Sequence, residues 1–277
     1  MPSITIGKEH TRTVELAYED HGRGKPVILI HGWPLSGKSW EKQVAVLVEA
    51  GHRVITYDRR GFGDSSRPID GYDYETLTDD LRRLVLTLGL QDLAIVGFSM
   101  GGGEVARYCG QYGTEHVRAA VFVSSVTPFL LKTADNPDGI DPSLFAGMCE
   151  AIGADRPAFL ETFLHDFFNA DVLGATRISE RAIEFHWNDA VRASPVATSQ
   201  LCTAWSATDF RADLARIDVP TLIIHGEADR TVPPAISARL THAAVSGSSL
   251  LMIPGAPHGL NWTHALELNR ALLDFLH

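Results

Sequence analysis

Three residues of this chain, Ser99, Asp229 and His258, are of the types that together carry out nucleophilic catalysis. Ser99 lies in Gly97-Phe98-Ser99-Met100-Gly101, which fits the pattern G-x-S-x-G, directly after the apolar run Leu93–Val96 and directly before a helical pattern. A serine between a strand and a helix sits on a tight turn at a helix N-terminus, where developing negative charge is favoured. This context predicts a nucleophile in preference to a structural serine in a glycine-rich turn.

A serine nucleophile needs a base, and the base needs a carboxylate that orients it. Asp229 lies just beyond the apolar run Thr221–Ile224, and His258 follows the run Leu250–Ile253. Both stand past the carboxyl ends of predicted strands, where open α/β sheets place their sites. Glu227 is the competing acid, but it lies two residues closer to its strand, so we predict Asp229 as the acid and His258 as the base. The other eleven histidines are expected to be surface or loop groups.

The negative charge of an attacked carbonyl needs two N–H donors in fixed positions. One is expected to be the backbone N–H of Met100, the residue after the nucleophile. The other is expected from the loop after the apolar run Val27–Ile30, where Trp33 follows the pair His31-Gly32. Pro34 biases the backbone of Trp33 away from the helical region and helps to hold this donor in place. The Trp33 side chain is free to be a core aromatic as well, because the donor is its backbone.

Buried apolar runs alternate with helical patterns, which is typical of a parallel sheet covered by helices on both faces. Strands are predicted at Thr13–Glu19, Val27–Ile30, Arg53–Tyr57, Leu93–Val96, Ala119–Val123, Thr221–Ile224 and Leu250–Ile253. Helices are predicted where apolar residues recur on one face, as Leu77, Leu81, Leu84 and Leu88 do, and again near the end of the chain.

This alternation stops between about 127 and 210, where no buried strand is apparent. Short helices are predicted there instead, at Ser143–Cys149, Pro157–Phe168 and Ser179–Val191. We therefore predict a single α/β domain, 1–277, with a mostly parallel central sheet and a helical cap inserted at about 127–210.

Composition narrows the class of protein further. The 277 residues carry 24 Lys and Arg against 34 Asp and Glu, a formal net charge of −10, which disfavours a general surface for nucleic acid or anionic membranes. No apolar run approaches the roughly 20 residues needed to span a bilayer, and the first residues do not resemble a signal peptide, so a cytoplasmic protein is expected. Cys109, Cys149 and Cys202 form neither a disulfide framework nor a zinc pattern, and we expect no metal or other cofactor. Cys109 is expected to be buried and inert. The sequence leaves a homo-oligomer open.

The chain also resembles the α/β-hydrolase fold, and within it the cofactor-free haloperoxidase, perhydrolase and aryl-esterase family. The resemblance runs along nearly the whole chain, through His31-Gly32-Trp33-Pro34, Asp58-Arg59-Arg60-Gly61-Phe62-Gly63-Asp64-Ser65, Gly97 to Arg107, Leu131-Lys132-Thr133, Thr208 to Leu214 and Gly255 to Leu260. It implies the same triad, Ser99, Asp229 and His258, the same donors, Trp33 and Met100, and a helical cap.

The resemblance implies an activity as well. An ester would acylate the serine, and water or hydrogen peroxide would release a carboxylic acid or a peracid. The peracid would oxidise bromide or chloride in solution, so that haloperoxidase activity needs no haem or metal. Pro34 is expected to fix loop carbonyls near the bound peroxide. The predicted cap is rich in aromatic residues, of which Trp205 and Phe129 flank its two ends and are the predicted pocket residues for a small or aryl ester.

Other functions share parts of this pattern of residues. Haloalkane dehalogenases and epoxide hydrolases resemble this fold but use an aspartate nucleophile, so Ser99 argues against both. A carbon–carbon bond hydrolase or a lactonase keeps the same triad and stays open, as does, more remotely, a small-ligand receptor with little turnover. A dinucleotide site at Gly101-Gly102-Gly103 is rejected, because no acidic residue ends a strand about 20 residues later.

Overall fold

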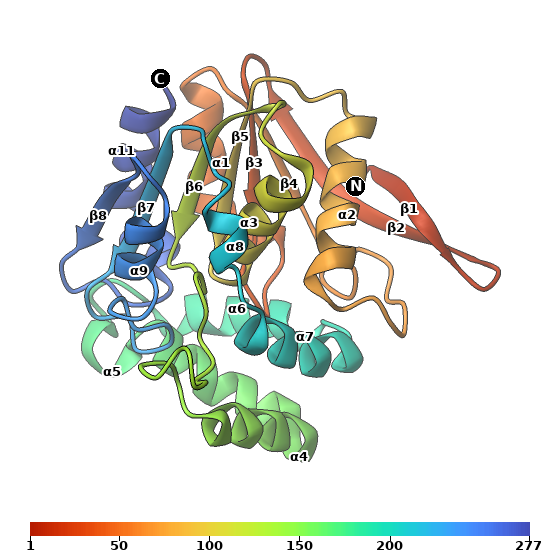
Figure 1. The fold of residues 1–277 in the computed structure, drawn as a ribbon. Coiled ribbons are helices and arrows are strands. Elements are labelled where there is room, and N and C mark those ends of the chain that lie inside the picture. The colour runs from red at the N-terminus through yellow and green to blue at the C-terminus, as the bar shows by residue number, and fades with distance from the viewer.

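A computed structural model describes residues 1–277 and shows an eight-stranded sheet between two layers of helices (Figure 1). The strand order is β1-β2-β4-β3-β5-β6-β7-β8, in which β1 pairs with β2 and β2 with β4 in antiparallel, and the six strands β3 to β8 pair in parallel. The strands are β1 (Ser3–Glu9), β2 (Arg12–Gly22), β3 (Pro26–Ile30), β4 (Arg53–Tyr57), β5 (Leu93–Phe98), β6 (Val117–Val123), β7 (Thr221–Gly226) and β8 (Ser249–Ile253). The α/β class and the seven predicted strands are confirmed, and β1 is an additional edge strand.

The parallel strands are apolar throughout because both of their faces are covered. Successive residues of β3 point to opposite faces, so Ile28 and Ile30 belong to one apolar core and Val27 and Leu29 to the other. The first core is covered by α2 (Tyr74–Thr87) and α3 (Met100–Tyr112), with the short α8 (Arg211–Leu214) and α9 (Ala238–Ala244) beside them. The second is covered by α1 (Glu41–Glu49), which follows a 3-10 turn at Gly37–Trp40, and by α10 (Leu260–Thr263) and α11 (Ala265–Leu276).

Four helices between β6 and β7 lie together across the end of the sheet where the parallel strands finish, at the bottom of Figure 1. They are α4 (Pro142–Phe167), α5 (Ala170–Leu173), α6 (Glu180–Val191) and α7 (Pro195–Ala207). Two of the predicted helices are the halves of α4, which bends at Asp155 (φ −153°, ψ 85°). Pro157 lacks an N–H and its ring clashes with the preceding turn, which accounts for the bend. Helix α7 was not predicted, although Ser194 caps it and Pro195 occupies its first position.

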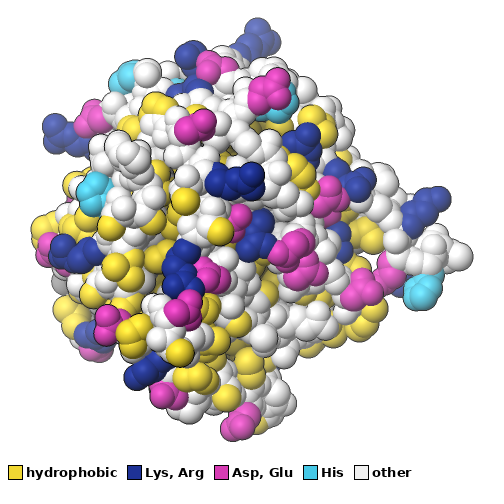
Figure 2. All heavy atoms as spheres, in the orientation of Figure 1, with side chains coloured by type: hydrophobic (Ala, Val, Ile, Leu, Met, Phe, Trp, Pro, Cys, Tyr) yellow, Lys and Arg dark blue, Asp and Glu magenta, His cyan; other side chains and the backbone are white.

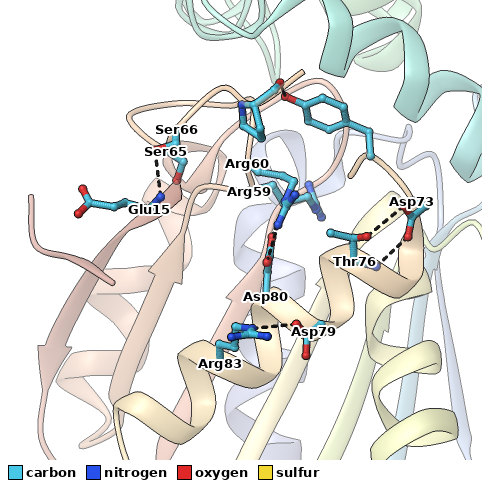
Figure 3. A network of polar contacts seen from close by, with 12 residues as sticks. Glu15, Arg59, Arg60, Ser65, Ser66, Asp73, Thr76, Asp79, Asp80 and Arg83 are labelled. Carbon is cyan, nitrogen blue, oxygen red and sulfur yellow. Dashed lines mark hydrogen bonds and ion pairs between the residues drawn. The ribbon is translucent and has the colours of Figure 1, made fainter. Parts of the chain in front are cut away.

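The loop between β4 and α2 carries several polar side chains that fix it to the sheet and to α2 (Figure 3). Arg60 reaches Asp80 on α2 through two hydrogen bonds of 2.7 and 2.8 Å. Asp73 caps α2, because its carboxylate accepts hydrogen bonds from the backbone N–H of Thr76 at 2.8 Å and from the Thr76 hydroxyl at 3.0 Å. No helix of the structure is long and apolar enough to cross a membrane. Basic and acidic side chains are interspersed on the face shown in Figure 2.

The cap of α2 gives a first prediction. Replacing Asp73 by Ala leaves the first N–H groups of α2 without their acceptor and should lower the free energy of unfolding by about 1 kcal/mol. The matched control is Asp79→Ala on the same helix, which removes the exposed ion pair with Arg83 and a long hydrogen bond of 3.4 Å from Tyr112 Oη, and should cost less than about 0.5 kcal/mol. Urea denaturation of both variants measures the difference. Equal losses would contradict the capping role of Asp73.

Candidate active site

The turn between β5 and α3 holds Ser99 in an unusual backbone conformation, φ +54° and ψ −119°. The Ser99 N–H donates to the Val123 carbonyl at 2.8 Å, which anchors the turn to the neighbouring strand β6. A Cβ atom on Gly97 would overlap the backbone of Gly101, and one on Gly101 would overlap the Ile30 carbonyl oxygen. The two outer glycines of G-x-S-x-G are therefore required by the close approach of strand, turn and helix.

The structure brings the three predicted catalytic side chains into one hydrogen-bonded chain. His258 Nε2 lies 2.8 Å from Ser99 Oγ, and His258 Nδ1 lies 2.7 Å from Asp229 Oδ2. Ser99 follows β5, Asp229 follows β7 and His258 follows β8, so the carboxyl ends of three strands on one side of the parallel sheet supply all three, with β6 between β5 and β7. Glu227, the competing acid, is exposed and makes no contact with the histidine. The three side chains have the arrangement in which a histidine accepts the proton of a serine hydroxyl.

The Asp229 carboxylate is fully buried and surrounded by donors. Burial by itself would raise the pKa of Asp229, but the charge of His258 and the hydrogen bonds from His225 and His258 outweigh it and hold that pKa well below its usual range. The backbone N–H groups of Thr231 and Val232 also donate to Oδ1, at 3.0 and 2.7 Å. Asp229 is therefore ionised at neutral pH, and it can stabilise a protonated His258.

The two predicted oxyanion donors lie in segments that flank Ser99. Met100 is the first residue of α3, so its N–H has no acceptor within the helix. The Trp33 backbone follows Gly32, where an added Cβ would lie 3.0 Å from the Cβ of Ser99. The Trp33 side chain is fixed separately, because its Nε1–H donates to the Thr198 carbonyl in α7 at 3.1 Å. Both backbone donors are thus attached to rigid elements beside the serine.

Comparison with known proteins agrees with this geometry. The alpha/beta hydrolase fold family matches residues 25–265, which is most of the chain. The chain belongs to this family. It is an α/β-hydrolase with a Ser-His-Asp triad.

Several relatives of this hydrolase are named for halide oxidation or perhydrolysis. A protein of Synechocystis sp. named "Putative non-heme chloroperoxidase" is 55% identical over 276 residues, covering 100% of both chains. A bifunctional esterase/perhydrolase of Acinetobacter calcoaceticus is 37% identical, covering 95% of this chain and 96% of its own. Among solved structures, the bromoperoxidase from Bacillus anthracis superposes with a TM-score of 0.96 at 51% identity and covers 99% of both chains.

Two adjoining cavities lead to the serine of the hydrolase. The inner one has a volume of only about 10 Å³, and the outer one about 570 Å³. The inner cavity is lined by Trp33, Ser99, Val126, Phe163, Trp205, Thr231 and Val232. Phe163, Trp205 and Thr231 line the outer cavity as well, so it opens directly onto the inner one.

The predicted pocket residues have different places in the structure. Trp205 lines both cavities, with its ring centroid 5.8 Å from that of Trp33 and 5.7 Å from that of Phe145. Phe129 lines neither cavity; its ring is buried and lies under the guanidinium of Arg211, 5.2 Å from centroid to Cζ. Pro34 is buried next to Trp33 in the chain and lines neither cavity.

The expectation that the other histidines are surface or loop groups is wrong for His186, which is buried within α6, and for His225, which is buried within β7. His31, His52 and His264 lie outside helices and strands but are also less than 10% exposed. His31 directly follows β3 and His225 lies within β7, so their places beside apolar runs were a signal of burial in the sequence. Cys109 is buried as predicted, and burial raises the pKa of its thiol to about 12, so it is inert.

A buried polar network lies beneath the oxyanion segments. The Arg59 guanidinium donates to the Glu104 carboxylate on α3 and to the His31 carbonyl that immediately precedes Gly32. Tyr57 Oη donates to the other Glu104 oxygen at 2.7 Å. Burial raises the pKa of Glu104, whereas Arg59 and the two hydrogen bonds oppose that shift. Arg59 therefore ties the segment that carries the Trp33 donor to the helix that begins at Met100.

This network gives a second prediction. Replacing Glu104 by Gln leaves the Arg59 guanidinium buried without a counter-charge and should lower the free energy of unfolding by about 3–5 kcal/mol. The matched control is Glu75→Gln at the exposed pair with Arg107, expected to cost less than about 1 kcal/mol. The double variant Arg59→Met/Glu104→Leu removes both charges and should recover most of the loss. Guanidinium denaturation checks all three, and a Glu104→Gln variant as stable as the control would contradict the prediction.

Proposed function

We propose that this protein hydrolyses small carboxylic esters through an acyl-enzyme and transfers the same acyl group to hydrogen peroxide. The observation that carries the proposal is the unbroken chain from Asp229 through His258 to Ser99, with distances of 2.7 and 2.8 Å, at the floor of a cavity. Relatives named as chloroperoxidases and as an esterase/perhydrolase support both halves of the proposal.

In the first half-reaction Ser99 Oγ attacks the ester carbonyl while His258 Nε2 takes its proton. The Trp33 and Met100 N–H groups stabilise the negative oxygen of the tetrahedral intermediate. Asp229 holds the imidazole in place and stabilises its positive charge. The protonated His258 then gives its proton to the leaving alcohol, and the acyl group stays on the serine.

In the second half-reaction His258 removes a proton from water or from hydrogen peroxide, and the resulting nucleophile attacks the acyl carbon. Water gives a carboxylic acid, and hydrogen peroxide gives a peracid, with Ser99 regenerated in both cases. The peracid then transfers one oxygen atom to a halide ion in solution, which yields a hypohalous acid and the carboxylate. Pro34 supports the peroxide branch by fixing the backbone of the loop beside the oxyanion donors.

The two cavities indicate where the parts of an ester lie. An inner volume of about 10 Å³ is close to the minimum that holds a single water molecule, so the space beside Ser99 favours the smallest acyl groups. The outer cavity, about 570 Å³ and lined by Phe145, Phe159 and Phe163 among others, suits an apolar or aromatic alcohol. We therefore assign the acyl side to the inner cavity and the leaving group to the outer one.

Ser99→Ala tests the common intermediate. The variant should lose p-nitrophenyl acetate hydrolysis by a factor on the order of 10⁴ or more, and peroxide-dependent bromination of monochlorodimedone should vanish with it. The matched control is Ser124→Ala, since Ser124 follows the neighbouring strand β6, is buried, and has an unpaired hydroxyl. Both assays use purified, metal-stripped protein.

The outcomes separate the alternatives. Loss of both activities in Ser99→Ala, with both kept in Ser124→Ala, supports one acyl-enzyme for both reactions. Bromination that survives without Ser99 would contradict the shared intermediate. Ester hydrolysis without any bromination would limit the protein to an esterase or lactonase, and absence of both in the wild type would overturn the proposal.

Pro34→Leu tests the peroxide branch by itself. The substitution frees the backbone of the segment that carries Trp33, so bromination should fall relative to p-nitrophenyl acetate hydrolysis, by about threefold or more if peroxide placement loses a fraction of one hydrogen bond. The ratio of the two rates, measured on the same preparation, is the readout. An unchanged ratio would contradict the role assigned to Pro34 and leave the esterase proposal intact.

A further inference from the structure

A second histidine reaches the acid of the triad from inside the sheet. His225 is the fifth residue of β7 and is completely buried. Its Nε2 lies 3.0 Å from Asp229 Oδ2 and 2.9 Å from the Val232 carbonyl oxygen. The mechanism derived above does not use this side chain.

The neighbours of His225 determine which of its nitrogens carries the proton. A carboxylate oxygen and a carbonyl oxygen both only accept, so Nε2 must be protonated and must donate to them. Nδ1 is buried and has no partner, so a second proton there would be a buried, unsatisfied donor. His225 therefore carries a proton on Nε2, which lies between the Val232 carbonyl oxygen and the carboxylate of the triad.

We propose that His225 is a positioning residue. It shares the Asp229 carboxylate with His258 and thereby sets how strongly His258 holds its proton. This inference rests on the proposed function. Oδ2 accepts from both imidazoles, at 2.7 Å from His258 and 3.0 Å from His225, while Oδ1 accepts from two backbone N–H groups. All four hydrogen-bond acceptor positions of the carboxylate are thus filled, and its plane is fixed.

The electrostatic consequence has a definite sign. The hydrogen bond from His225 draws negative charge on Oδ2 toward itself, which leaves less of that charge to stabilise a protonated His258. Without His225 the carboxylate binds the imidazolium more strongly and its orientation is less well fixed. His258 should then keep its proton to higher pH. Proton transfer from Ser99 should be slower, because the less well fixed carboxylate orients the imidazole less well toward the serine.

No other ionisable side chain shares this role. On the segments packed around the triad, Asp166, Glu227 and Arg230 are exposed, and none forms a hydrogen bond with Asp229 or His258. His165 on α4 likewise bonds neither residue. Arg230 is held by Asp171 on α5, at 2.9 and 3.1 Å. His225 is the one side chain besides His258 that bonds the Asp229 carboxylate.

Two substitutions separate the N–H from the rest of the side chain. His225→Leu removes the donor and fills most of the volume, whereas His225→Gln places an amide N–H where the imidazole Nε2–H was. For His225→Leu we expect kcat for p-nitrophenyl acetate to fall about tenfold, as for the loss of one hydrogen bond to a charged group, with little change in KM. We also expect the acidic limb of the kcat/KM profile to move to higher pH by about half a unit or more. His225→Gln should restore both toward the wild type.

The matched control is His52→Leu, which replaces another buried histidine at the opposite end of the sheet, just before β4. It should leave the pH profile unchanged, and denaturant unfolding of each variant shows the folded fraction. If His225→Leu does not fold, His225→Asn takes its place, because its shorter amide cannot reach Asp229; it should show the shifted profile while His225→Gln does not.

An unshifted acidic limb in the variants without the donor, or a His225→Gln variant that behaves like His225→Leu, would overturn the inference. Either result would leave the proposed function standing, because that function fails only if Ser99-dependent ester hydrolysis is absent from the wild type.

Discussion

Ser99 holds a backbone conformation, φ +54° and ψ −119°, that residues other than glycine rarely adopt, so the structure around it has to enforce that conformation. Enforcement comes from the hydrogen bond to Val123 on one side and from the contact between Gly97 and Gly101 on the other. The strained turn aims the hydroxyl at His258 and at the same time starts α3, whose first N–H is the proposed oxyanion donor. The nucleophile and this proposed donor are therefore fixed by one turn of the backbone.

The second proposed oxyanion donor, Trp33, lies in the loop after a different strand, β3, and its distance from the first has to be maintained independently. The Arg59–Glu104 pair spans that gap through the His31 carbonyl, inside the molecule, where water cannot compete. From the opposite direction the cap holds the Trp33 side chain through Thr198. The loop is thus held on one side by the buried ion pair and on the other by the hydrogen bond from the Trp33 side chain to α7.

The residues of the site that could be predicted from the sequence are those whose local pattern is compatible with a single structure. A G-x-S-x-G between an apolar run and a helical pattern predicts Ser99, and polar residues after the ends of buried strands predict Asp229 and His258. His225 could not be assigned in this way, because its partner depends on how the loop after β7 folds back. Phe129 was misplaced for a related reason, since distance from the ends of the insertion does not tell which way a ring points. Strand β1 and helix α7 gain their stability from tertiary contacts that periodicity does not record.

The pairing of β6 with β7 has a consequence for how the chain matures. Val123 pairs with Ile224, so this strand pairing closes a chain loop that contains the whole cap insertion. The entropy cost of closing such a loop grows only slowly with its length. Trp33, Ser99 and Met100 all precede that closure, whereas Asp229 and His258 follow it. During synthesis the nucleophile emerges long before its base. A chain whose synthesis stops inside the cap has Ser99 but neither His258 nor Asp229, so its serine is inert. Ester turnover therefore requires that β7 and β8 have joined the sheet.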